Sequence, residues 1–259
     1  MSHRSILGLP PHPYVVPLLE RLSTVGLFDC RVDAGARNAL QLRERHLHAA
    51  LLTPVEYGRD SSDYVVLPGA AIAARDPSGP VSLVVRRGAR TIATLAADPA
   101  CAGEIVLARI LLAEEFNAFP SIVPASGTLS GMLDRADAAL VVGQPEHLPR
   151  GVTALDLVED WFELTDLPYC YGMWCMREGV LSRVAADTIA ETHRSVDAQP
   201  AAGDVGGSAF SYLLTTEVQE SIREMLHYAF YHGMLPDVPD LRFASWEDDD
   251  ASGDDLMAG

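Results

Sequence analysis

The feature that most constrains this chain is a regular alternation of short apolar segments with longer amphipathic ones. Short apolar runs bounded by turn residues are typical of strands, and apolar residues three and four apart are typical of helices. Strand-like segments occur at residues 5–9, 28–32, 49–54, 64–68, 70–74, 79–86, 92–95, 121–124, 138–143 and 169–176. Helical segments occur at 14–22, 36–48, 103–116, 130–135, 155–165, 183–193 and 216–232. The alternation predicts an α/β fold with a largely parallel sheet.

Charge and hydropathy exclude several functional classes. The chain carries a formal net charge of −17, and all 19 of its basic residues are arginine. Such an acidic surface repels phosphate groups, so we expect no nucleic-acid partner and no binding to anionic membranes. No apolar run approaches the roughly 20 residues that cross a bilayer, and the N-terminus lacks a signal-peptide pattern. We therefore expect a cytoplasmic protein, and the sequence leaves its oligomeric state open.

The cysteines and histidines form no metal-binding pattern. Cys30, Cys101, Cys170 and Cys175 include no CxxC pair, and a cytoplasmic chain keeps its thiols reduced. The eight histidines are scattered without an HExxH or similar spacing. We therefore expect no metal ion, and we expect Cys170 and Cys175 to be buried, unreactive thiols.

Three stretches carry a resemblance to a known family. The first runs from Asp156-Leu157-Val158-Glu159-Asp160-Trp161 through Leu164-Thr165-Asp166-Leu167-Pro168-Tyr169 to Trp174. The second is Ala136-Asp137-Ala138-Ala139-Leu140-Val141-Val142-Gly143, and the third combines Phe210-Ser211-Tyr212-Leu213-Leu214 with Gly233-Met234-Leu235-Pro236. In order and spacing, residues 5–243 resemble the chorismate dehydratase family of the futalosine route to menaquinone.

The resemblance implies a fold as well as an activity. It implies a type 2 periplasmic-binding-protein-like fold, in which two α/β lobes enclose a ligand cleft and are joined by two crossover strands. We expect the crossovers near residues 81–86 and 169–175. Lobe one then combines residues 1–85 with 175–243, lobe two spans residues 86–174, and residues 244–259 form an acidic, disordered tail.

The activity implied is that of a carbon–oxygen hydro-lyase, which removes water from chorismate and needs no cofactor. Its ligand is a small carboxylate, so the protein has chiefly to orient the ring and help a hydroxyl group leave. The resemblance makes Ser82 the candidate catalytic residue, because it follows Gly79-Pro80-Val81 as a serine follows a similar element in the family. The alternative is a strand serine bonded to a neighbouring backbone group.

The resemblance also implies substrate-binding positions, several of which have changed here. The family's N-terminal asparagine falls on Pro10, and His12 is a candidate replacement as a polar group or general acid. Thr53 matches a small polar position that lines the cleft. Tyr169 and Tyr171 match aromatic positions in the second crossover, and strand alternation places both on one face.

In lobe two, Gly103 and Glu104 replace a pair of hydroxyl residues that grips a carboxylate. Backbone N–H groups at this predicted helix start can still bind an anion, and we expect Glu104 itself to be a favourable surface charge. Gly143 is retained, whereas Gln144 stands in place of the family's aspartate. These departures leave two alternatives to a working dehydratase: a paralogue that acts on a different substrate, and a non-catalytic protein that binds a small carboxylate.

Overall fold

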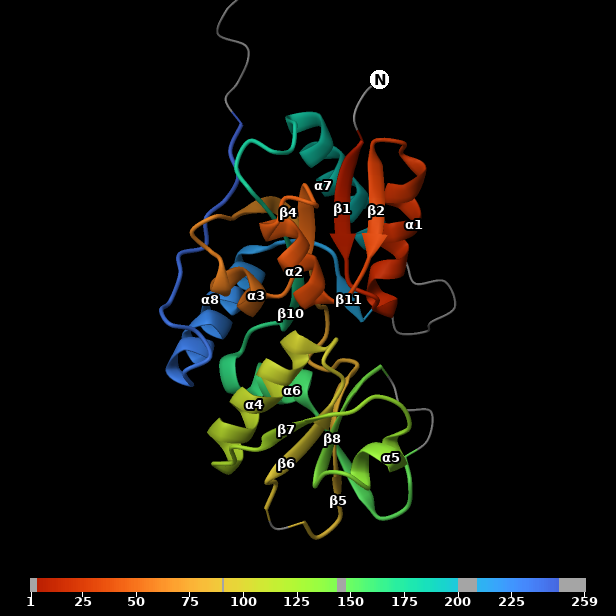
Figure 1. Ribbon diagram of the computed structural model, residues 1–259, viewed down its shortest axis with the longest axis vertical. Helices are drawn as coiled ribbons and strands as arrows, with labels where there is room; N and C mark the ends of the chain where they lie inside the picture. The colour runs from red at the N-terminus through yellow and green to blue at the C-terminus, as the bar shows by residue number, and fades with distance from the viewer. Residues whose placement is uncertain (1–3, 90, 144–147, 200–208, 247–259) are drawn as a thin grey trace, which may run out of the picture.

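A computed structural model describes residues 4–89, 91–143, 148–199 and 209–246 of the chain. The described chain forms two lobes, one above the other in Figure 1, and each lobe is built on its own sheet. No helix among these residues has both the length and the apolar composition needed to cross a membrane.

The first lobe contains a six-stranded sheet in the order β11-β4-β10-β3-β1-β2. Its strands are β1 (Ser5–Leu9), β2 (Phe28–Val32), β3 (Ala49–Leu52), β4 (Val65–Ala74), β10 (Cys170–Met176) and β11 (Phe210–Ser211). β1 pairs in parallel with β2 and β3, whereas β10 runs antiparallel to both β3 and β4. The prediction of a largely parallel sheet is therefore wrong, because β10 returns from the other lobe and enters the sheet in the opposite direction.

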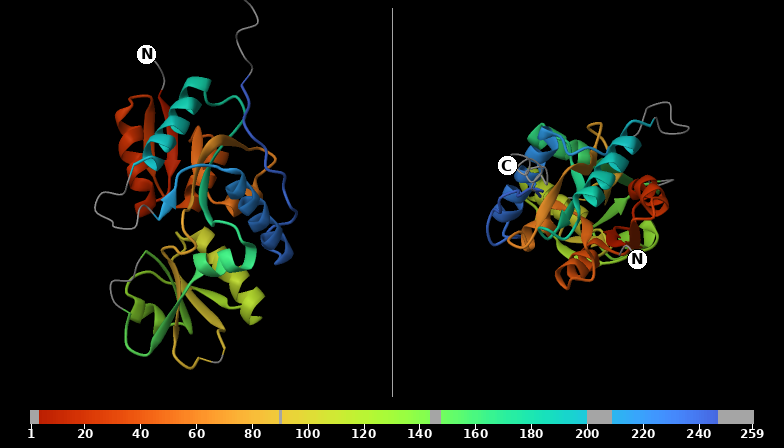
Figure 2. Two further views of the ribbon diagram at one scale, coloured as in Figure 1. Left: turned by 180° about the vertical axis from the view of Figure 1, so that it is seen from behind. Right: turned by 90° about the horizontal axis from the view of Figure 1, so that it is seen from above.

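Helices cover both faces of this sheet (Figure 2). The lobe contains η1 (Pro13–Val15), α1 (Val16–Thr24), α2 (Gly35–Arg43), α3 (Pro54–Arg59), α7 (Arg183–Asp197) and α8 (Thr216–Tyr231). α1 and α7 pack together, while α2, α3 and α8 form a second group. Every residue of β10 is buried, as expected for an apolar strand with both faces covered.

Local chemistry sets several helix boundaries. The Thr215 side chain caps α8 by accepting from the Val218 N–H group, and Gly233 follows the helix with φ of +68°. α2 ends earlier than its apolar pattern predicts. Its last residue is Arg43, and the chain then turns at Arg45, whose φ is +64°.

The second lobe contains a five-stranded sheet in the order β7-β6-β8-β5-β9. Its strands are β5 (Val81–Arg86), β6 (Thr94–Ala97), β7 (Ser121–Pro124), β8 (Ala138–Val142) and β9 (Val152–Asp156), and its helices are α4 (Ala102–Phe116), α5 (Leu129–Leu133) and α6 (Leu157–Thr165). The sequence analysis did not predict β9. Its last residue, Asp156, caps α6 through the Val158 and Glu159 N–H groups, so strand and helix adjoin without a turn.

Both connections between the sheets, residues 75–80 and 166–169, lie ahead of the expected crossover strands rather than within them. β5 is bonded wholly into the second sheet and β10 wholly into the first. The expected divisions at residues 85/86 and 174/175 therefore cut through these two strands. At the C-terminal end, the Ala244 N–H group donates to the Val66 carbonyl at 2.9 Å, and Trp246 Nε1 donates to the Leu181 carbonyl at 3.1 Å. Residues 244–246 thus pack on the first lobe, although a tail was expected from 244.

Candidate functional site

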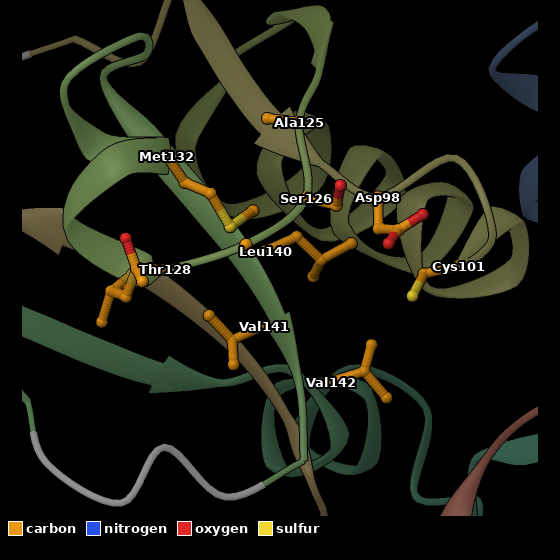
Figure 3. A pocket seen from close by; sticks show the side chains of 11 residues that line it. Asp98, Cys101, Ala125, Ser126, Thr128, Met132, Leu140, Val141 and Val142 are labelled. Carbon is orange, nitrogen blue, oxygen red and sulfur yellow. The ribbon is translucent and has the colours of Figure 1, made fainter.

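A cavity of about 640 Å³ lies on the second lobe at the carboxyl ends of β6, β7 and β8. It is lined by Asp98, Cys101, Ala125, Ser126, Gly127, Thr128, Leu129, Met132, Leu140, Val141 and Val142. Figure 3 shows Asp98, Cys101 and Ser126 toward one end and Thr128 with Met132 toward the other. Loops at the carboxyl ends of strands are common ligand sites in α/β proteins, so this cavity is the candidate site.

His12 of the first lobe lies close enough to Asp98, a lining residue of the cavity, to feel its charge. Burial lowers the pKa of His12, and the charge of Asp98 partly opposes that effect. The His12 ring stacks on Tyr14 with centroids 5.0 Å apart and planes inclined by 18°. His12 is therefore a neutral imidazole at pH 7, which can accept a proton.

Behind His12, four aromatic rings form a cluster between the lobes. Tyr14 lies 5.0 Å from Tyr171 and 5.3 Å from Phe210, and Tyr169 lies 4.9 Å from Tyr171 with the rings nearly perpendicular. The prediction that Tyr169 and Tyr171 share one face is confirmed by this contact. Tyr14 and Phe210 were not predicted, because aromatic residues in apolar segments give no signal that separates a site from a core.

The hydroxyl group of Tyr171 is buried and has no hydrogen-bond partner among the described residues. It lies against Gly79, since a Cβ atom on that glycine would come within 2.5 Å of the Tyr171 oxygen. Gly79 itself donates its N–H group to Asp156 Oδ2 at 3.0 Å. An unpaired buried hydroxyl is costly, so a ligand that supplies an acceptor here gains binding energy.

Ser82 lies on β5 between β8 and β9. Its register partners are Val141 and Asp156, and directly opposite residues of antiparallel strands point to the same face about 5 Å apart. The half-buried Ser82 side chain therefore lies on the same face of the sheet as Val141, one of three consecutive β8 residues that line the cavity, although Ser82 is not itself part of the described lining. Within the described part of the chain its hydroxyl makes no hydrogen bond, so the alternative of a strand serine bonded to backbone does not hold.

Thr53 and Gly103 lie where the two lobes meet. Thr53 is the N-cap of α3 and shares a capping box with Glu56, whose carboxylate accepts from the Thr53 N–H group. Gly103, in the first turn of α4, packs directly against the Thr53 side chain. The structure therefore brings these two predicted residues together, at the lobe junction rather than in the lining of the cavity.

Glu104 departs from its expected role. It is 2% exposed and lies beside Tyr14, whose hydroxyl donates to Glu104 Oε1 at 3.5 Å. Burial raises the pKa of Glu104 to about 7, and the charge of Glu56 adds to that effect. The expectation of a surface charge at this helix start is wrong, because α4 begins at the lobe junction and its first turn is covered by the other lobe.

The remaining predicted residues belong to the turns around the site. The Pro10 carbonyl accepts from the His12 N–H group at 2.9 Å, which shapes the turn that carries His12. Gly143 follows β8 with φ of +103°, a conformation that favours glycine, and donates its N–H group to the Pro80 carbonyl at 2.7 Å. Gln144 lies outside the described residues.

Sequence reasoning missed the hydroxyl groups of Ser126 and Thr128. Both line the cavity, and Thr128 also caps α5 by accepting from the Gly131 N–H group. A Ser-Gly-Thr turn between a strand and a helix was the available signal. Within the described ranges, no three His, Cys, Asp or Glu side chains gather as metal ligands would.

Comparison with solved structures shows the fold. A protein from Archaeoglobus fulgidus is 15% identical over 90% of this chain and 99% of its own, with a TM-score of 0.66. A structure described as an ABC transporter from Parabacteroides distasonis is 15% identical over 95% of this chain and 99% of its own, with a TM-score of 0.61. The periplasmic aliphatic sulphonate binding protein of Escherichia coli is 11% identical over 93% of this chain and 96% of its own, with a TM-score of 0.59. The two-lobed, type 2 periplasmic-binding-protein-like fold expected from the sequence is therefore confirmed.

A comparison with family models identifies the chain more closely than the fold does. The model described as menaquinone biosynthesis matches residues 7–205. That range runs from within β1 to beyond the end of α7 and includes all of the predicted site residues. The chain therefore belongs to the menaquinone biosynthesis family.

Proposed function

We propose that this protein is a chorismate dehydratase, which converts chorismate to 3-[(1-carboxyvinyl)oxy]benzoate and water in the futalosine route. Membership of the menaquinone biosynthesis family supports the pathway. The observation that supports the proposal is the Ser82 hydroxyl, which lies on the same face of the sheet as the lining residue Val141 and has no hydrogen-bond partner among the described residues.

The reaction breaks one ring C–O bond and one C–H bond on the neighbouring ring carbon. The electron pair of the C–H bond completes the aromatic ring, and the departing hydroxyl takes up a proton and leaves as water. In this proposal Ser82 donates a hydrogen bond to the departing hydroxyl. His12, neutral at pH 7, takes the ring proton and returns it to the departing oxygen. No oxidant or reductant is consumed.

The substrate's two carboxylates need donors in a cavity whose described lining contains no basic residue. The lining supplies the Ser126 and Thr128 hydroxyls, and the backbone N–H groups at the start of α4 and the unpaired Tyr171 hydroxyl lie outside that lining, at the lobe junction. Hydroxyl and backbone donors at a closed cleft orient a ligand without a formal positive charge.

Chromatography of chorismate incubated with the purified protein tests the proposal. We expect loss of chorismate and appearance of the enolpyruvyl benzoate, with Ser82→Ala lowering kcat at least a hundredfold, the effect of removing one preorganised donor. Ser121→Ala is the matched control, because Ser121 is exposed at the opposite end of the second sheet. No product from folded wild-type protein rejects the dehydratase.

A carboxylate-binding protein without turnover is the second candidate. It is favoured by the replacement of two expected hydroxyl groups with Gly103 and the buried Glu104. The same experiment distinguishes the two, since this candidate predicts that chorismate binds and is recovered unchanged. A paralogue with another substrate predicts neither binding nor turnover of chorismate.

A further inference from the structure

Glu104 is an acid enclosed between the lobes. Its helix, α4, begins in the second lobe at Ala102 after the N-cap residue Cys101, and its first turn is covered by Thr53 and Tyr14 of the first lobe. The Glu104 side chain is almost fully removed from solvent. Burial of an ionised carboxylate without a cation is strongly unfavourable, so this environment favours the neutral acid.

The groups that face Glu104 are themselves neutral or acidic. They are Tyr14 from η1, Glu56 from α3, Tyr171 from β10, Tyr169 directly before that strand, and Cys101 at the N-cap of its own helix. Among the described residues, none of these groups is a cation. Burial raises the pKa of Glu104 to about 7, so the proton is held near neutral pH.

Two contacts connect this acid to the candidate site. Cys101, three residues earlier, lines the cavity. Tyr14, which donates to Glu104, stacks on His12, and His12 is close enough to Asp98 in the lining to feel its charge. An anion bound in the cavity therefore shares a poorly solvated region with Glu104, where like charges repel strongly.

We propose that Glu104 couples ligand binding to proton uptake, so that the cleft takes an anionic carboxylate ligand together with one proton. This coupling rests on the proposed function in one respect, because it assumes that the ligand is a carboxylate. A negative ligand and an ionised Glu104 exclude each other, so above neutral pH the acid has to recover its proton before the ligand binds. Glu104 acts as a specificity-determining residue, because it makes the affinity for anions depend on pH.

Titration calorimetry with chorismate, and with 3-hydroxybenzoate as a probe that cannot be dehydrated, tests the coupling. The wild-type affinity is expected to fall about 16-fold between pH 7 and 8.5, with a slope that approaches tenfold per pH unit at the upper end, as one linked proton requires. Heats measured in two buffers of different ionisation enthalpy give the protons taken up, with more than half a proton expected per ligand at pH 8. Glu104→Gln, which is neutral at every pH, should show a flat profile and bind more tightly than wild type at pH 8.5.

Glu115→Gln is the matched control, since Glu115 is exposed on the same helix about 16 Å further along. It should retain the wild-type pH profile. Binding without proton uptake, or uptake that persists in Glu104→Gln and disappears in His12→Gln or Asp98→Asn, overturns the coupling and leaves the dehydratase intact. Proton-coupled binding of chorismate without product overturns the dehydratase and leaves the coupling intact. Absence of heat from both probes overturns both.

Discussion

Gly103 of α4 and Thr53 of the first lobe touch so closely that a Cβ atom on Gly103 would lie 2.5 Å from Thr53 Cγ2. The backbone at the start of α4 thus packs directly on the N-cap residue of α3. Thr53 cannot simply rotate away, because its hydroxyl accepts from the Glu56 N–H group and caps α3. The juxtaposition explains why glycine is tolerated in the first turn of a helix at this position.

Gly103→Ala is therefore expected to push the lobes apart at this contact. Overpacking of a close contact costs about 1–3 kcal/mol, and the free energy of unfolding should fall by that amount. Affinity for a ligand in the cleft should fall as well. Denaturant unfolding and calorimetric binding measure both effects. The double variant Gly103→Ala with Thr53→Ser should restore them, because serine keeps the capping hydroxyl and lacks the methyl group. If the double variant is no better than the single one, the contact is not the cause.

Tyr171→Phe is expected to stabilise the protein while weakening its ligand binding. Removal of a buried hydroxyl without a partner relieves an unfavourable group, so the unliganded protein should gain about 1 kcal/mol. Affinity for a carboxylate should fall about tenfold through loss of one donor. Thermal unfolding and calorimetry report the two changes.

Tyr64→Phe is the control for that variant. The Tyr64 hydroxyl is also buried without a partner among the described residues, but it precedes β4 in the first lobe and is not part of the candidate site. We expect the same gain in stability and unchanged binding. A loss of binding in Tyr64→Phe would show that the effect of Tyr171→Phe is not local.

His193 is expected to make the protein sensitive to acid. Its Nε2 atom accepts from Trp174 Nε1 at 2.8 Å, and because tryptophan only donates, the remaining Nδ1–H group donates to the Tyr212 carbonyl. Burial lowers the pKa of His193 from its usual 6.5 to about 4. The stability contributed by the neutral ring is complete above pH 6.5 and is lost as the pH falls to about 4, about 3 kcal/mol in total.

His193→Gln tests this point, since glutamine keeps one donor and one acceptor but does not ionise. Between pH 6.5 and 4 the variant should lose about 3 kcal/mol less than wild type in denaturant unfolding. His227→Gln, an exposed histidine on α8, should follow the wild-type profile. Parallel profiles for wild type and His193→Gln would contradict the prediction.

Glu104 is expected to change the pH dependence of stability in the opposite direction to His193, over an overlapping range of pH. Its pKa rises from 4.5 to about 7 on folding, so the folded state holds a proton that the unfolded state releases. The contribution of the neutral acid is complete below pH 4.5 and is lost as the pH rises to about 7, on the order of 3 kcal/mol. In wild type the two slopes partly cancel between pH 4.5 and 6.5. Unfolding of Glu104→Gln over that range should therefore show stability that rises more steeply with pH than in wild type.

The sequence predicted the fold more completely than the site. The apolar segment that forms β10 was identified as a strand buried on both faces, because its seven successive residues are apolar or small and show no alternation with polar residues. β9 was missed because it ends at the residue that caps α6, so no turn separates the two patterns. Strand direction was wrong for β10, since hydrophobic periodicity carries no information about which neighbour a strand will find.

Site residues were predicted where chain neighbours determine their position and missed where tertiary contacts do. Tyr169 and Tyr171 share a face because they are two residues apart at one strand. Glu104 was misplaced because its burial depends on Tyr14, 90 residues earlier in the chain. Glu104 therefore looks like an ordinary helix-start charge in the sequence and is a buried acid in the fold.

The order of strands in the first sheet determines when that sheet can form during synthesis. β3 and β4 are consecutive in the chain, but they are not neighbours, because each pairs with β10. While the ribosome is still translating residues between β4 and β10, the nascent chain holds the first lobe as two separate pieces. The second sheet is contiguous in the chain, from Val81 to Asp156, and is complete first. The inserted lobe can therefore fold before the lobe that surrounds it, and arrival of residues 170–176 joins the two halves of the first sheet.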